Sequence, residues 1–250
     1  MVKNIRSDPA ATIRRSLKER GVIGTAGWLG TTAWNYSVRI SRSAQTWLAN
    51  HLFDFWNNVD TRGTIDQSDL EFDSANADHS NRYVAVTPGL FRRMVATLAI
   101  EHRRFTFVDI GSGKGRAMLL ASAWPFRRIL GVELSPKLHE IAKHNIDRYR
   151  RRTLVCRNLR SLWCDAALFP IPPTDLVLYL YNPFREPVMR QVLDNIRRSW
   201  EEHPREIYIL YRTPVLNNLL VTSGFLRRVQ TNEHFSVYHA SARSSSVRAA

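Results

Sequence analysis

The sequence predicts an α/β fold: a doubly wound, mostly parallel sheet preceded by a helical N-terminal extension. Residues 105–135 have the order strand, glycine loop, helix and strand, which implies a parallel strand pair with a right-handed crossover. Residues 174–181 form an almost continuous apolar run, as expected of a central parallel strand that is buried on both faces. Two further runs, 225–230 and 235–240, are spaced as a hairpin that closes the sheet.

The N-terminal third carries the weakest pattern. Residues 10–20 are consistent with a basic amphipathic helix, and residues 32–56 with a helix that has a large aromatic face. We expect this face to pack onto the main domain; the alternatives are contact with a partner, a substrate or a membrane surface. Residues 54–78 are polar and acidic, which favours a loop region that could act as a flap over the active site.

Caps and periodicity place the other elements. Thr87 is suited to cap a helix that starts at Pro88, where apolar residues then recur at helical spacing. A second cap followed by proline, Ser135-Pro136, starts another helix. The same criteria predict helices over 186–200 and 214–221 and strands over 161–164 and 207–211. We therefore expect an extension over 1–80, a main domain over 81–242 and a flexible tail over 243–250.

The glycine loop is the most informative motif. The predicted strand Thr106–Ile110 is followed by Gly111, Gly113 and Gly115, then by a helix over 116–124 that ends before Pro125. A second buried strand, 128–132, ends on the acid Glu133. Ligands of such sheets bind beyond the carboxyl ends of the strands, where the glycines and this acid both fall.

Three ligand classes compete for such a loop. A phosphate-binding P-loop fails twice, because Val108 stands where its first glycine should be and Gly115 follows Lys114 in place of Ser or Thr. A dinucleotide fingerprint fails once, because Arg116 occupies the position of its third glycine. The pattern G-x-G-x-G fits at every position, and its missing Cβ atoms let the backbone turn sharply and touch a ligand.

With Asp109 before the loop and Glu133 placed 22 residues after Gly111, this stretch resembles motif I and its partner acid in class I S-adenosylmethionine-dependent methyltransferases. The resemblance spans about residues 83–240 and implies a Rossmann-like, seven-stranded sheet with S-adenosyl-L-methionine as cofactor. It implies that Asp109 and the loop hold the methionine end and that Glu133 accepts from the ribose hydroxyls. The cofactor-binding residues expected from this stretch are Asp109, Gly111, Ser112, Gly113, Gly115, Glu133 and Leu134.

Two further segments extend the resemblance to the cofactor's other contacts. Asp165-Ala166 follows the third predicted strand, where the family often carries an acid that accepts from the adenine amino group. Tyr83 and Thr87 lie in the segment that closes over the cofactor in several members. For these two residues a packed ring and a helix cap are equally good interpretations.

Asn182-Pro183-Phe184 ends the central strand at the position of motif IV, where the acceptor meets the methyl group. It resembles the [D/N]-P-P-[F/Y] tetrapeptide of amino-group methyltransferases with one proline missing, and also a subset of seven-strand protein-lysine methyltransferases. The resemblance implies that Asn182 and the Pro183 carbonyl orient a nitrogen acceptor, protein lysine or small amine, while Phe184 packs against it. The alternative is a strand that simply ends at proline with a packed ring. A sulfonium methyl needs no metal, and we predict none.

Composition leaves the acceptor open. The formal charge of +14 suits acidic partners such as RNA, which makes a nucleic-acid methyltransferase the alternative; an arginine-rich, solvated surface explains the charge equally well. A second alternative is a cofactor-binding module without activity. Cys156 and Cys164 lack CxxC spacing, which favours reduced thiols and a cytoplasmic protein. The sequence has neither an 18-residue apolar run nor a signal-peptide core, so we expect no spanning helix, though peripheral membrane contact through the N-terminal region stays open.

Overall fold

The computed structural model describes residues 15–16, 18–19, 44–66, 76–149 and 154–242. It divides the chain into two compact units, Met1–Ala49 and Asn50–Ala250. Residues 50–66 therefore share a unit with the main domain that the sequence places from residue 81 onward. Most of the helix predicted over 10–20, the first part of the aromatic helix and the tail over 243–250 lie outside the described residues.

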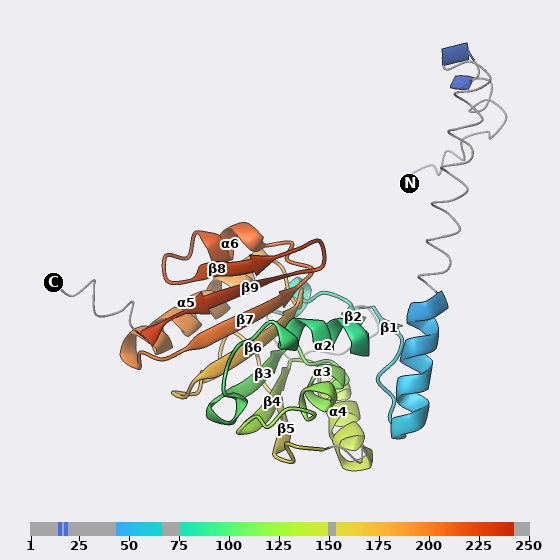
Figure 1. The fold of residues 1–250 in the computed structure, drawn as a ribbon, viewed down its shortest axis with the longest axis horizontal. Coiled ribbons are helices and arrows are strands. Elements are labelled where there is room, and N and C mark those ends of the chain that lie inside the picture. Colours follow the sequence, from blue (N-terminus) through green and yellow to red (C-terminus); the bar gives the residue numbers. More distant parts are fainter. Residues whose placement is uncertain (1–14, 17, 20–43, 67–75, 150–153, 243–250) are drawn as a thin grey trace. The chain divides into compact units, whose positions relative to one another are not determined.

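A seven-stranded sheet of order β5-β4-β3-β6-β7-β9-β8 forms the centre of the second unit (Figure 1). The five strands from β5 to β7 run parallel, and β9 pairs antiparallel with both β7 and β8. This confirms the predicted doubly wound, mostly parallel sheet with its closing hairpin. The strands are β3 (Thr106–Ile110), β4 (Arg128–Glu133), β5 (Leu159–Trp163), β6 (Leu176–Tyr181), β7 (Ile207–Arg212), β8 (Arg227–Thr231) and β9 (Phe235–Ala240).

Helices cover both faces of this sheet, and the strand alternation explains how. On β3, Phe107 packs in one core cluster while Val108 and Ile110 pack in the other. The first cluster holds α2 (Pro88–Ala96) and α3 (Arg116–Ala121), and the second holds α5 (Glu186–Glu202) and α6 (Asn217–Val221). The remaining elements are α4 (Pro136–Arg148), the 3₁₀ turns η2 (Ala77–His79) and η3 (His102–Arg104), and the short strands β1 (Thr64–Ile65) and β2 (Tyr83–Val84), which pair antiparallel.

Several predicted boundaries move. The helix after the glycine loop ends at Ala121, three residues before Trp124, because the chain tightens into a turn in which the Trp124 amide donates to the Ala121 carbonyl at 3.0 Å. The helix expected from Pro214 begins only at Asn217, since Thr213 has a left-handed φ of 51° and starts a turn.

The segment expected to be a loop from Asp54 onward begins inside a helix that spans residues 44–57. This helix does not bury its aromatic face as expected. Phe53 is buried, whereas Phe55 and Trp56 are 76% and 75% exposed. The helix contributes one ring and one acid, Asp54, to the interior rather than a whole aromatic stripe.

Candidate active site

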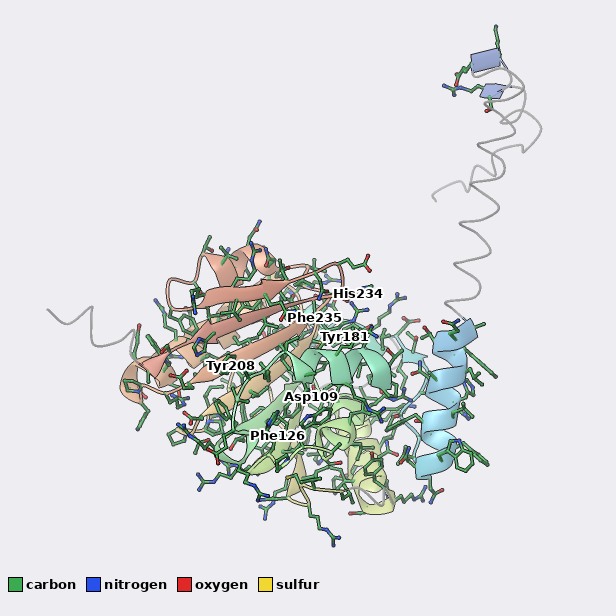
Figure 2. The ribbon with its side chains drawn as sticks, in the orientation of Figure 1. Asp109, Phe126, Tyr181, Tyr208, His234 and Phe235 are labelled. Carbon is green, nitrogen blue, oxygen red and sulfur yellow. The ribbon has the colours of Figure 1, made fainter. Side chains whose placement is uncertain are left out.

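A pocket enclosing about 900 Å³, solvent at its mouth included, lies at the carboxyl ends of β3, β4, β5 and β6. It brings together eleven of the predicted residues from five separate stretches of sequence. Two of its residues, Asp109 and Tyr181, are labelled in Figure 2 and come from the neighbouring strands β3 and β6. We name this the central pocket. The predicted residues that line it are Tyr83, Asp109, Gly111, Ser112, Gly113, Glu133, Leu134, Asp165, Ala166, Pro183 and Phe184.

The glycines of the loop are required by backbone angle and by close neighbours. The backbone φ values are 76° at Gly111, 54° at Gly113 and 85° at Gly115, and residues other than glycine rarely adopt such values. A Cβ on Gly111 would lie 2.5 Å from the Pro183 Cβ, and one on Gly113 would overlap the ring of Tyr83. The loop therefore packs directly against the Asn-Pro-Phe segment on one side and the Tyr83 ring on the other.

Glu133 ties the second strand to this loop. Its Oε2 accepts from the Gly113 amide at 2.7 Å and its Oε1 accepts from the Ser135 amide at 2.9 Å. Burial raises the pKa of this carboxyl, and the hydrogen bonds from Ser135 and Gly113 oppose the rise. A carboxylate has about four acceptor positions, more than these backbone amides occupy, so it can still accept from ligand hydroxyls.

Asp109 is the second acid of the pocket, and it lacks a complete set of partners. It is 2% exposed, and its Oδ2 has no hydrogen-bond partner within the described part of the chain. Burial, followed by the charge of Glu133, raises the pKa of Asp109 well above its usual range. The hydroxyls of Ser112 and Tyr179 also line the pocket, and both are buried without a hydrogen-bond partner among the described residues. Unsatisfied buried acceptors and hydroxyls of this kind suit a ligand that carries an ammonium group.

The Asp165 carboxylate is part of the lining of the central pocket and accepts two hydrogen bonds. Its Oδ1 accepts from the Ala167 amide and its Oδ2 from the Asn76 side chain, both at 2.9 Å. This anchors the segment before β2 to the end of β5. A third acid thus faces the pocket at the position where the adenine amino group is expected.

The Asn-Pro-Phe segment is held differently from the expectation. The Asn81 amide donates to the Pro183 carbonyl, and the Asn81 side chain donates to the Asn182 carbonyl, both at 2.9 Å. Both carbonyls are therefore engaged by the segment before β2. The Asn182 side chain accepts from the Tyr211 hydroxyl at 3.4 Å, and burial raises the pKa of Tyr211 to about 12, which keeps this donor protonated.

Asn182 lines a second, adjoining pocket rather than the central one. This outer pocket encloses about 1030 Å³ with the solvent at its mouth, and it shares residues 80–82, Val84 and Tyr181 with the central pocket. Its other lining residues include Asp66, Asn182, Arg185 and Thr213. The two pockets therefore adjoin along their shared wall.

Two predicted residues support the site from outside. Gly115 caps α3, where a Cβ would lie 3.3 Å from the Ala142 Cβ, so its small size permits the close packing of α3 on α4. Thr87 lies at the start of α2 and uses its carbonyl, which accepts from the Phe91 amide at 3.1 Å. Neither lines the central pocket.

Sequence reasoning missed Arg116, Tyr179 and Asn76, which all line the central pocket. Arg116 was detectable, because a charged residue directly after the glycines and inside an apolar helix needs a buried partner. Tyr179 was hidden in the apolar run of β6, and Asn76 gave no signal at all. Within the described ranges there is no cluster of three metal-ligating side chains. No helix of those ranges has the length and apolarity needed to cross a bilayer.

Comparison with known proteins gives fold-level likenesses. No family model and no curated protein matches the chain. An RNA methyltransferase from Salinibacter ruber, solved with S-adenosyl-L-homocysteine, is 18% identical over 63% of this chain and 92% of its own, with a TM-score of 0.41. A dimethyladenosine transferase from Plasmodium falciparum is 12% identical over 66% of each chain, with a TM-score of 0.48. The methyltransferase domain of bacterial CtHen1-CN is 14% identical over 61% of this chain and 97% of its own, with a TM-score of 0.45.

The chain's own architecture gives the fold: five parallel strands closed by an antiparallel hairpin, with the loop and two acids at the carboxyl ends of β3 and β4. This strand arrangement is the Rossmann-like methyltransferase fold, and the glycine loop with Asp109 and Glu133 resembles motif I and its partner acid in class I S-adenosylmethionine-dependent methyltransferases.

Proposed function

We propose that the protein is an S-adenosylmethionine-dependent methyltransferase that transfers a methyl group by direct in-line displacement to a nitrogen acceptor. The observation that carries the proposal is that Asp109 and Glu133 lie in one pocket beside the glycine loop, with Asp109 Oδ2 buried and without a hydrogen-bond partner among the described residues. Two buried carboxyls that raise each other's cost of ionisation favour a cationic ligand. S-adenosylmethionine carries two positive charges, on its sulfonium and its ammonium.

In this proposal, different residues of the central pocket bind different parts of the cofactor. Asp109 accepts from the ammonium group, and the free lone pairs of Glu133 accept from the ribose hydroxyls. Asp165 accepts from the adenine amino group, with Ala166 beside the ring. The bound cofactor supplies an activated methyl group on sulfur. The protein then has to align the acceptor and exclude water, and alignment alone can contribute several kcal/mol.

The outer pocket is the best entrance for the acceptor. Asn182 and Thr213 directly follow the neighbouring strands β6 and β7. Both line this pocket and have left-handed φ values of 43° and 51°. Backbone strain of this kind concentrates at functional sites. The side-chain oxygen of Asn182 is an acceptor suited to an amine, and Tyr181 and Phe184 offer rings against which the developing positive charge can pack. A protein lysine or a small amine satisfies this geometry.

RNA is the second candidate acceptor, and one specific observation favours it. Arg82 and Arg185 are both exposed and both line the outer pocket, so its rim can contact phosphates. The formal charge of +14 supports the same interpretation. RNA binding that weakens steeply with salt would favour this candidate, whereas salt-insensitive methylation of a protein or an amine would favour the first.

Calorimetric titration tests the cofactor assignment. The wild type and Glu133→Ala are titrated with S-adenosylmethionine, S-adenosyl-L-homocysteine and NADH. We expect binding of the first two in the micromolar range by analogy with ordinary metabolite sites, and its loss in the variant. Binding of NADH alone, or of none of the three, contradicts the proposal. Transfer of a tritiated methyl group onto separated protein, RNA and small-molecule fractions then identifies the acceptor class.

A further inference from the structure

Residues 54–62 hold the glycine loop, although none of them lines the central pocket. We call this segment the strap. It runs from the last turn of the helix over 44–57 to the residues before β1. Its contacts to the rest of the second unit concentrate on the residues that follow and flank the three glycines.

The first contact is a buried ion pair. Arg116, the first residue of α3, is 1% exposed, and its guanidinium donates to the Asp54 carboxylate at 2.8 Å and to the Thr61 hydroxyl at 2.6 Å. Asp54 is 4% exposed and also accepts from the Thr61 and Arg62 amides at 2.8 and 2.7 Å. The guanidinium also lies over the Phe53 ring, 4.9 Å from its centre. A buried charge with this many partners has a single favourable position.

The second contact involves Lys114, the loop residue that lies between Gly113 and Gly115. Lys114 donates to both Asp60 carboxylate oxygens at 3.0 and 3.1 Å and to the Arg62 carbonyl at 3.2 Å. Asn145 of α4 donates to the Asp60 and Lys114 carbonyls and accepts from the Asp60 amide, at 2.8 to 2.9 Å. The strap, the loop and α4 are thus joined around one amide side chain.

The third contact reaches the pocket itself. The Tyr83 hydroxyl donates to the Thr61 carbonyl at 2.5 Å, and the Tyr83 ring lies against Gly113. Thr61 is fully buried, and its own amide and hydroxyl are fixed by Asp54 and Arg116. The position of the ring over the loop therefore depends on the ion pair through one shared residue.

We propose that Asp54 and Arg116 are positioning residues of the cofactor site: through Thr61 they set the Tyr83 ring over Gly113 and hold the glycine loop in its binding conformation. The proposal rests on the cofactor assignment made above. It also explains why an arginine follows the third glycine. The charge anchors a segment more than fifty residues earlier in the chain, with sequence separations of 55 to Thr61 and 62 to Asp54.

The test uses two variants, Asp54→Asn and Arg116→Met, that each break the ion pair holding the strap; we call them the strap variants. They are compared with a matched control, Arg205→Met, in the full chain. Arg205 is also buried, and it donates to the Thr174, Ser199 and His203 carbonyls, away from the central pocket. Three quantities are measured: the thermal midpoint, the Kd for S-adenosyl-L-homocysteine and the amide hydrogen exchange of the peptide containing residues 111–115. Tyr83→Phe is added as a mild variant, because it keeps the ring and removes only the bond to Thr61.

We expect both strap variants to bind S-adenosyl-L-homocysteine about tenfold more weakly and to exchange faster at the loop, since small misplacements of binding groups are costly. Arg205→Met should lose thermal stability with an unchanged Kd and unchanged loop exchange. Tyr83→Phe should weaken binding without lowering the thermal midpoint appreciably. Equal loop exchange in the strap and control variants, or unchanged binding in folded strap variants, overturns the proposal. If the wild type binds no cofactor, the proposed function fails, while the exchange comparison still decides the role of the strap.

Discussion

At the scale of single residues, the central pocket contains a buried acid, Asp109, whose ionised form makes the folded state less stable. Asp109 is buried beside Glu133, and one of its oxygens has no partner in the described ranges of the chain. Its pKa is raised well above the usual range. Because the folded state holds this proton more tightly than the unfolded chain, the resulting stability is present at low pH. It is lost as the pH rises through the raised pKa. Above that raised pKa the ionised carboxylate therefore costs stability, which a cationic ligand can return.

Replacing this acid should separate stability from binding. We expect Asp109→Asn to raise the thermal midpoint at a pH above the raised pKa of Asp109, since it replaces a buried charge with a neutral amide of similar shape. It should also weaken S-adenosylmethionine binding about tenfold or more. Thermal melting and calorimetric titration measure the two effects. A variant that is both less stable and unchanged in affinity would show that Asp109 is only a structural residue.

The same raised pKa predicts how binding depends on pH. Protonated Asp109 cannot pair with an ammonium group, so cofactor affinity should fall as the pH is lowered through the raised pKa, at a pH above the ordinary range of aspartate. Asp109→Asn should lose much of this dependence and keep only the part due to Glu133, whose pKa is also raised. Kd values measured across the pH range in both proteins check this, and identical profiles would contradict it.

The proposed acceptor contact is tested at Asn182. Because alanine is strained at a φ of 43°, Asn182→Ala is paired with Asn182→Gly, which loses the same side chain without that strain. Both should lower turnover about a hundredfold, the scale of one lost oriented contact in a transition state. Both should bind the cofactor as the wild type does. Loss of binding in step with turnover, in both variants, would remove Asn182 from the acceptor site.

At the scale of elements, the glycine loop is a turn whose shape is set by its neighbours as much as by its own torsions. Gly113 and Gly224 both have left-handed backbones, with φ values of 54° and 79°. Only Gly113 has a close neighbour, the Tyr83 ring, whereas nothing lies within 4 Å of a Cβ at Gly224. Comparing substitutions at Gly113 and Gly224 therefore separates the effect of backbone strain from the effect of a clash with the Tyr83 ring.

We expect Gly113→Ala and Gly224→Ala to share a backbone penalty of about 1 kcal/mol. Only Gly113→Ala should displace the Tyr83 ring and abolish cofactor binding. Thermal melts and titrations of both variants measure this. If Gly224→Ala weakened binding to the same extent, the effect would lie in general destabilisation and not in the loop.

The sequence predicted the elements whose signal is local. The runs that became β3, β4 and β6 are mostly apolar, and the glycines, Asp109 and Glu133 lie at fixed offsets from strand ends. The contacts that complete the site have no local signal. Asp54 looked like the start of a polar loop, yet it is buried against Arg116, because only the folded chain brings residues 62 positions apart together. Likewise, the pairing of Asn81 with the Pro183 carbonyl depends on how the segment before β2 lies along the end of β6.

At the scale of the whole molecule, charge dominates the expected behaviour in solution. The chain has 36 basic and 22 acidic residues and a pI of about 10.5. Such an excess of one sign weakens the compact state through self-repulsion, which dissolved salt screens. It also raises the local concentration of anionic partners.

Sodium chloride should therefore stabilise the protein. We expect the thermal midpoint to rise between about 20 and 300 mM salt, a range over which the screening length falls severalfold. A neutral osmolyte at matched osmolality, which does not screen charge, serves as the control. A midpoint that falls with salt would mean that attractive pairs such as Lys143 with Glu140 outweigh the repulsion.

The arginines also bear on how the sheet ends. β8 is the outermost strand beside β9, and all five of its residues are exposed. It begins with Arg227 and Arg228, and its pairing with β9 shifts register between Arg228 and Gln230. A charged and kinked border makes a poor template for another strand. The molecule can therefore leave its mixed sheet open on this side and stay dispersed when it is crowded with copies of itself.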